Sequence, residues 1–204
     1  MDHHLRAVAP AGQDQALATA VCRLRRPPHA ARSCTWRRAA TMNGRQVIQK
    51  SLDQAQYVVQ AYLQDLTDAE LLVRPVPGAN HIAWQLGHLI KSEHQMVEAA
   101  FPGTMPQLPS GFAERYTSET AKLDDSAAFH TKAEYLQVYG QQRAATQALL
   151  ERITDDDLDR PAPEAYRSYA PTVGHLLALQ ALHSLMHAGQ WAVVRRKLGR
   201  APLF

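Results

Sequence analysis

Apolar residues recur at steps of three and four along four stretches of the chain, which is the spacing of one face of an α-helix. In the first stretch, Ile48, Leu52 and Val59 share such a face. The pattern predicts helices over about residues 44–66, 81–100, 131–152 and 172–199. Four long helices indicate an all-α protein built as a four-helix bundle.

Polar residues with known capping preferences mark where these segments begin. Asn80 is a good N-cap for the second helix. Thr131 and Glu134 have the spacing of a capping box at the start of the third helix. Thr67 and Glu70 have the same spacing, so we expect a capped turn between the first two helices.

Residues 101–130 are rich in proline and glycine and predict a long irregular crossover between the second and third helices. Within it, Phe112 and Tyr116 either cover a pocket or pack onto the bundle, and packing is the favoured interpretation. LTDAELLVRP at 66–75 also resembles ITDDDLDRP at 153–161, and each is followed by GHL at the same spacing. The chain is therefore interpreted as two helix pairs joined by the crossover.

The first 41 residues differ from the rest in composition. They hold seven Arg, no Lys and two Asp, so their net charge is +5. Because the whole chain has a net charge of +3, residues 42–204 have a net charge of −2. With no sustained period, residues 1–41 are expected to be a disordered Arg-rich leader before a bundle domain of residues 42–204. A targeting peptide, a nucleic-acid-binding arm or a wrongly assigned start would each explain the leader. The last is favoured because Met42 directly precedes the first helical pattern.

Charge and hydropathy exclude several classes of partner. No run of about 18 apolar residues occurs, so no membrane span is expected. Phosphate binding needs a concentrated basic face, which a bundle domain of charge −2 does not favour, so nucleic-acid binding is not expected. Both cysteines, Cys22 and Cys34, lie in the leader and imply no disulfide framework, and a cytoplasmic location is the expectation.

The segment HSLMHAGQ in the last helix carries the clearest candidate chemistry. His183 and His187 are four residues apart, so they share a helix face about 6 Å apart along the axis and could bind one metal ion. Gln190 continues the same polar line. Many such pairs are only surface or hydrogen-bonded residues, and Ser184 stands where an HExxH motif has its general base.

A metal site needs at least one more protein ligand. His175 lies about 12 and 18 Å along the helix from the pair and cannot join it. On the second helix, His88 is favoured over His81 and His94, because it lies in the uncharged middle of that helix, one turn from Trp84.

The motifs WQLGHL, HSLMHAGQ and RRKLG together resemble the DinB/YfiT-like family of metal-binding four-helix bundles, over roughly residues 44–202. The resemblance implies an up-down-down-up bundle and a divalent metal, zinc or nickel, held by His88, His183 and His187. We expect Trp84 and Gln190 to lie next to these ligands. Gln190 either supports a ligand or packs within the bundle.

The resemblance also implies a function. Characterised branches of the family are similar to S-transferases that use a low-molecular-weight thiol such as bacillithiol or mycothiol, so we expect a thiol S-transferase acting on a small electrophile. A metal-dependent hydrolase and a non-catalytic, stress-related metal-binding scaffold remain alternatives. A homodimer formed through exposed bundle faces is a further expectation.

Overall fold

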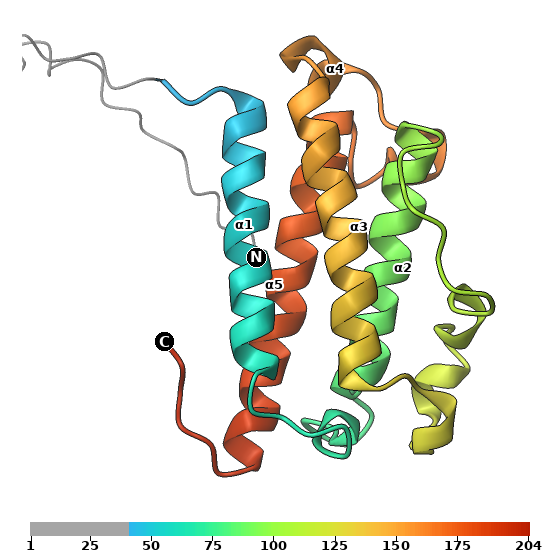
Figure 1. Cartoon of the computed structure of the whole chain (residues 1–204), viewed down its shortest axis with the longest axis vertical. Coiled ribbons are helices and arrows are strands. Elements are labelled where there is room, and N and C mark those ends of the chain that lie inside the picture. Colours follow the sequence, from blue (N-terminus) through green and yellow to red (C-terminus); the bar gives the residue numbers. More distant parts are fainter. Residues whose placement is uncertain (1–40) are drawn as a thin grey trace, which may run out of the picture. The chain divides into compact units, whose positions relative to one another are not determined.

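The computed structural model describes residues 41–204, and these form four long helices and one short one. The helices are α1 (Gly44–Leu63), α2 (Ile82–Ala100), α3 (Lys132–Arg152), α4 (Asp155–Asp159) and α5 (Val173–Lys197). Figure 1 shows that α1 and α5 run in one direction and that α2 and α3 run in the other. The predicted all-α, up-down-down-up four-helix bundle is thus confirmed. The expectations for the leader and its two cysteines fall outside the described residues.

The neighbours within the bundle follow from this topology. Helix α5 packs against α1 along most of its length, and α2 packs against both α3 and α5. Among residues 41–204 there is no β-strand, only an isolated bridge between Pro161 and Thr172. None of the helices in this part of the chain combines the length and apolar character needed to cross a membrane.

Capping boxes form at both of the positions where the sequence predicts them. Thr131 and Glu134 cap α3 reciprocally. Thr67 and Glu70 do the same in the turn after α1, which ends at Leu63, three residues earlier than expected. In the second half of the internal similarity, Thr154 forms an equivalent box with Asp157 at the start of α4.

The predicted N-cap of α2 is wrong by one residue. His81, rather than Asn80, caps this helix, and its Nδ1 accepts a hydrogen bond of 3.1 Å from the Trp84 backbone N–H. The ring is fully buried, its Nε2 lies 3.0 Å from the Leu123 carbonyl oxygen, and it forms a T-shaped pair with the ring of Phe129. Burial requires a partner for both ring nitrogens, and the cap position supplies one of them.

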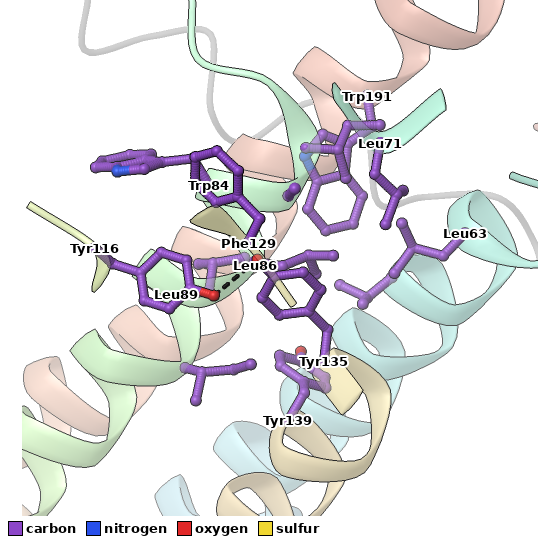
Figure 2. Close-up of a cluster of buried hydrophobic side chains, with 14 of the residues drawn as sticks. Leu63, Leu71, Trp84, Leu86, Leu89, Tyr116, Phe129, Tyr135, Tyr139 and Trp191 are labelled. Atoms are coloured by element: carbon purple, nitrogen blue, oxygen red, sulfur yellow. Dashed lines mark hydrogen bonds between the residues drawn. The ribbon is translucent and has the colours of Figure 1, made fainter. Parts of the chain in front are cut away.

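The crossover between α2 and α3 contains only three short 3₁₀ turns, Ala113–Arg115, Thr120–Lys122 and Ser126–Ala128. Phe112 and Tyr116 are buried in the bundle core, which confirms the packing interpretation. The Tyr116 hydroxyl donates a 2.7 Å hydrogen bond to the Tyr135 hydroxyl on α3, as Figure 2 shows. The phenol ring of Tyr116 rests against Gly87, where a side chain would overlap it. The glycine of WQLGHL therefore lets the crossover lie on α2.

A buried ion pair joins α2 to α3 inside the bundle. Arg143 Nη2 lies 3.0 Å from Glu93 Oε2, and both side chains are almost completely buried. The same nitrogen donates to Tyr139 Oη at 3.0 Å and to Ser184 Oγ at 3.1 Å. Thr146 donates to the other oxygen of Glu93 at 2.7 Å. The polar network links three of the four long helices.

Candidate metal centre

Three histidine rings from two helices converge on one point at the junction of α2 and α5. His183 Nε2 lies 3.2 Å from His88 Nε2 and 3.2 Å from His187 Nε2. One ligand nitrogen from each ring falls within 4.8 Å of the others. The structure therefore brings together the three residues that the sequence analysis singles out. In residues 41–204 no other group of three His, Cys, Asp or Glu side chains has this arrangement.

The helices explain why these rings meet. His183 and His187 lie one turn apart on α5, so their rings project from the same side, with centroids 4.9 Å apart. Helix α2 packs beside α5, and His88 approaches the pair edge-on, with its centroid 5.0 Å from that of His183. The seam between two antiparallel helices thus supplies ligands that are 95 residues apart in sequence.

Trp84 holds the His88 ring in place. The two rings stack with centroids 5.0 Å apart and planes 7° from parallel. Trp84 is itself anchored, because its Nε1–H donates to the Thr117 carbonyl oxygen at 3.0 Å. The crossover therefore fixes the orientation of a residue on α2 through an aromatic stack.

Gln85 orients His187, a role that was not predicted from the sequence. Its side chain is buried, and its Oε1 accepts a 2.7 Å hydrogen bond from Trp191 Nε1–H. An indole N–H can only donate, so this contact assigns the oxygen end of the Gln85 amide. The same oxygen lies 3.1 Å from His187 Nδ1, which must therefore carry the proton and donate. His187 Nε2 is left with its lone pair facing the other two rings.

A signal for Gln85 was present in the sequence. Gln85 is a polar residue in the first half of a helix that is otherwise apolar there apart from His88, so it needs a buried partner, by the same reasoning that singled out the histidines. Gln190, the other expected supporting residue, forms no hydrogen bond with any of the three histidine rings. Its Oε1 accepts from Gln85 Nε2 at 2.8 Å, so it acts on His187 through Gln85.

The environment keeps the three imidazoles neutral. Burial, together with the neighbouring His88, lowers the pKa of His183 to about 4. Burial, followed by the effects of His183 and His88, lowers the pKa of His187 to about 4. The pKa of His88 is also lowered, by burial first and then by the Lys91 ammonium. Neutral rings offer lone pairs to a cation at physiological pH.

The separations between the ring nitrogens fit a metal ion. Tetrahedral zinc with nitrogen ligands at about 2.0–2.1 Å places those nitrogens about 3.3 Å apart. The observed separations of 3.2 Å from His183 to each of its neighbours match this value. Imidazole also suits nickel, copper and iron, so the donor set does not select one metal.

The remaining histidines of the described chain have other partners. His94 Nδ1 lies 3.1 Å from Gln142 Oε1, and His130 Nδ1 lies 2.5 Å from the Tyr116 hydroxyl. His175 is close to the Thr172 hydroxyl that caps α5, at 2.9 Å. His81 caps α2. Each of the alternative third ligands is thus engaged away from the triad.

Comparison with known proteins gives a family and two structural neighbours. Residues 51–191 match the family model of the DinB superfamily. None of the curated proteins compared with the chain matches it. A solved structure of a conserved protein from Enterococcus faecalis aligns with 78% of this chain and 100% of its own, at 19% identity and a TM-score of 0.57.

The second neighbour is YfiT from Bacillus subtilis, described as a probable metal-dependent hydrolase with an unusual four-helix bundle topology. It aligns with 79% of this chain and 93% of its own, at 16% identity and a TM-score of 0.54. At these identities, the two neighbours support the fold.

Proposed function

Because the chain belongs to the DinB superfamily, we propose that it is a divalent-metal-dependent hydrolase of a small molecule, with His88, His183 and His187 as the metal ligands. The observation that carries the proposal is the convergence of three neutral imidazoles, in which His183 Nε2 lies 3.2 Å from the Nε2 of His88 and 3.2 Å from that of His187. Three protein ligands of this kind leave a coordination position for water or substrate, as in catalytic zinc sites. The description of YfiT as a probable metal-dependent hydrolase supports the same assignment.

The chemistry follows from the charge of the donors. A divalent ion held by His88, His183 and His187 would supply an uncompensated positive charge, which would acidify a bound water and polarise a carbonyl or phosphoryl oxygen. Gln85 holds His187 in the Nδ1–H tautomer, so that the lone pair of its Nε2 is available to a metal ion. Trp84 restrains the plane of His88 by stacking. The protein residues thus set ligand direction before any substrate arrives.

Thiol S-transfer is the second candidate function. The neutral charge of the three imidazole ligands favours it, as it favours hydrolysis. Neutral imidazoles do not offset the charge of the ion, so a bound thiol would lose its proton as readily as a bound water. In this case the thiolate attacks an electrophilic carbon, and the leaving group departs with the bonding electron pair. The two candidates share the metal site and differ in the nucleophile.

Metal analysis tests the shared part of the proposal. The full-length protein is purified after expression in medium containing zinc and nickel, and its metal content is measured beside that of His183→Ala and His175→Ala. We expect about one ion per chain in the wild type and in His175→Ala, and almost none in His183→Ala. His175 is a matched control because it is exposed on the same helix. Equal metal content in all three proteins would exclude the triad as the binding site.

Product analysis separates the two candidates. The metal-loaded protein is incubated with p-nitrophenyl esters in ¹⁸O-water, and with alkyl halides in the presence and absence of a small thiol. Hydrolysis predicts ¹⁸O in the carboxylate product, whereas S-transfer predicts a thioether that forms only when the thiol is present. Neither product should form with His183→Ala.

A further inference from the structure

Lys91 lies on α2 three residues after His88, on the side of the helix that solvent can reach. From Ile82 to Ile90, every residue of α2 is buried except His88. Lys91 is half-buried and Gln95 is exposed, so residues 88, 91 and 95 follow one accessible line at helical spacing. A ligand at His88 would therefore have Lys91 as its neighbour on the same face of the helix.

The crossover holds the Lys91 side chain close to His88. Lys91 Nζ donates a 3.1 Å hydrogen bond to the Tyr116 carbonyl oxygen. The next carbonyl oxygen, that of Thr117, accepts from the indole N–H of Trp84, whose ring stacks on His88. Successive carbonyl groups of the crossover thus bind the side chains that lie about one turn before and one turn after His88. The Lys91 ammonium is near enough to contribute, after burial, to the lowered pKa of His88.

No acidic side chain compensates the charge of Lys91. Within residues 41–204, Lys91 forms no ion pair. No carboxylate in this part of the chain contributes to the pKa shifts of the three triad histidines. A divalent ion bound by the triad would therefore be near a second positive charge, with no negative charge to offset either. The Lys91 ammonium has three N–H groups and uses one of them on Tyr116, so it can still donate to an anion.

We propose that Lys91 determines substrate specificity by binding a carboxylate of the substrate while the reacting group of the same molecule is at the triad. A single ammonium group matches the single negative charge of a carboxylate. Residues three apart on a helix have β carbons about 5–6 Å apart, so the carboxylate should be only a few bonds from the reacting group. The substrate class is thus a small carboxylic acid with a second, reactive group. The inference rests on the proposed function, which places that reactive group at the metal ligands.

Three thiols of similar length that differ in charge test this inference on the full-length, zinc-loaded protein. They are 3-mercaptopropionate, 3-mercaptopropan-1-ol and 3-aminopropane-1-thiol. A thiol is suitable because its thiolate is a zinc ligand, which directs each probe to the triad. By isothermal titration calorimetry, the dissociation constant should increase from the carboxylate to the alcohol to the ammonium probe. We expect roughly a tenfold difference between the first two, the usual value of a hydrogen bond to a charged group.

Variants of Lys91 separate its charge from its structural contact with Tyr116. In Lys91→Met, the preference for the carboxylate probe over the alcohol should fall by roughly tenfold, whereas Lys91→Arg should keep most of it. Lys50→Met is the matched control, because it removes an ammonium that is 71% exposed and paired with Asp53 on α1. Its preference should equal that of the wild type. A merely structural role for Lys91 would instead weaken the binding of all three probes and leave their ranking intact.

NMR of the metal-free wild type provides a test that depends neither on zinc nor on the folding of a variant. 3-Mercaptopropionate should shift the side-chain signals of Lys91 and the ring signals of His88. At the same concentration, 3-mercaptopropan-1-ol should shift them much less, because it carries no charge for the ammonium to bind. The side-chain signals of Lys50 should respond equally little to both compounds.

Two results would overturn the inference. One is the same preference for the carboxylate probe in the wild type and in a folded Lys91→Met variant. The other is the absence of carboxylate-dependent shifts at Lys91 in both the metal-free and the zinc-loaded wild type. Failure of the proposed function would look different, because the triad would then bind neither zinc nor the thiols, while the carboxylate-dependent shifts at Lys91 would persist in the metal-free protein.

Discussion

Gly87 and Tyr116 are in such close contact that a β carbon at residue 87 would overlap the phenol ring. Alanine is the better helix former by about 1 kcal/mol, so helix propensity alone would favour Gly87→Ala. The ring is 2% exposed and hydrogen-bonded to Tyr135, which leaves it little room to move. We expect Gly87→Ala to lower the free energy of unfolding by about 1–3 kcal/mol, the usual cost of overpacking. Urea denaturation measures the change.

Gly140 offers a matched control on another helix. It lies in the middle of α3, and a β carbon there would have no neighbour within 4 Å. Gly140→Ala should therefore stabilise the protein by up to about 1 kcal/mol. If both substitutions were stabilising, the proposed contact between the crossover and α2 would be refuted.

Gln85→Leu should weaken metal binding without removing a ligand. The substitution deletes the acceptor for His187 Nδ1–H, so the ring loses its fixed tautomer and orientation. We expect the affinity for zinc, measured by competition with a chelator, to fall by roughly tenfold to a hundredfold. In the metal-free wild type, ¹⁵N spectra of His187 should show a protonated Nδ1.

Gln95→Leu is the control for that substitution, because Gln95 is exposed on the same helix. Its zinc affinity should equal that of the wild type. An unchanged affinity in Gln85→Leu would argue against a positioning role for Gln85, even if the variant were less stable.

The buried pair of Glu93 and Arg143 should behave non-additively. Arg143→Met leaves the Glu93 carboxylate buried with only Thr146 as a partner, and we expect a loss of about 3–5 kcal/mol. The double variant Arg143→Met/Glu93→Leu removes both charges and should be more stable than Arg143→Met alone. A double-mutant cycle in urea measures the coupling.

The exposed ion pair of Lys50 and Asp53 is the control for the buried pair of Glu93 and Arg143. Its side chains are 71% and 40% exposed, so Lys50→Met should change stability by no more than about 0.5 kcal/mol. A similar small effect for Arg143→Met would show that the ion pair inside the bundle is dispensable.

Asp65 should make part of the stability depend on acidic pH. The hydrogen bond from Arg195 is the main reason that the pKa of Asp65 is lowered from 3.8 to about 2, with further attraction from Arg195 and Arg200. A depressed carboxyl pKa stabilises the fold above the unfolded value, and this contribution is lost as the pH falls from about 4 to 2. The stability difference between wild type and Asp65→Asn should therefore be present at pH 5 and shrink toward pH 2. A difference that stays constant over this range would contradict the assignment.

The helices could be predicted because their determinants are local. Apolar spacing and the capping box of Thr131 and Glu134 depend on residues within a turn or two of each other. Asn80 shows where local preference fails. Its neighbour His81 is buried against Phe129 and near Leu123, more than 40 residues away, and this tertiary environment decides which residue caps α2.

In the candidate site, too, the features that depend on nearby residues could be predicted, and those that depend on distant residues could not. The spacing of His183 and His187 on one helix could be read from the sequence. The position of His88 on the second helix favoured it as the third ligand, and the family resemblance implied the same residue. Gln85 was missed because its role depends on Trp191, which lies 106 residues later in the chain. Spacing along one helix cannot show which way an amide on another helix is turned.

His88 and His183 are separated by 95 residues, and His187 belongs to the last helix of the bundle. An ion bound by all three rings would be a cross-link between distant parts of the chain, so it could be captured only after α5 has left the ribosome and docked onto α2. Uptake of the metal would then have to follow the synthesis of α5, and a chain truncated before α5 could not acquire it. In this protein, metal content would report the completion of folding.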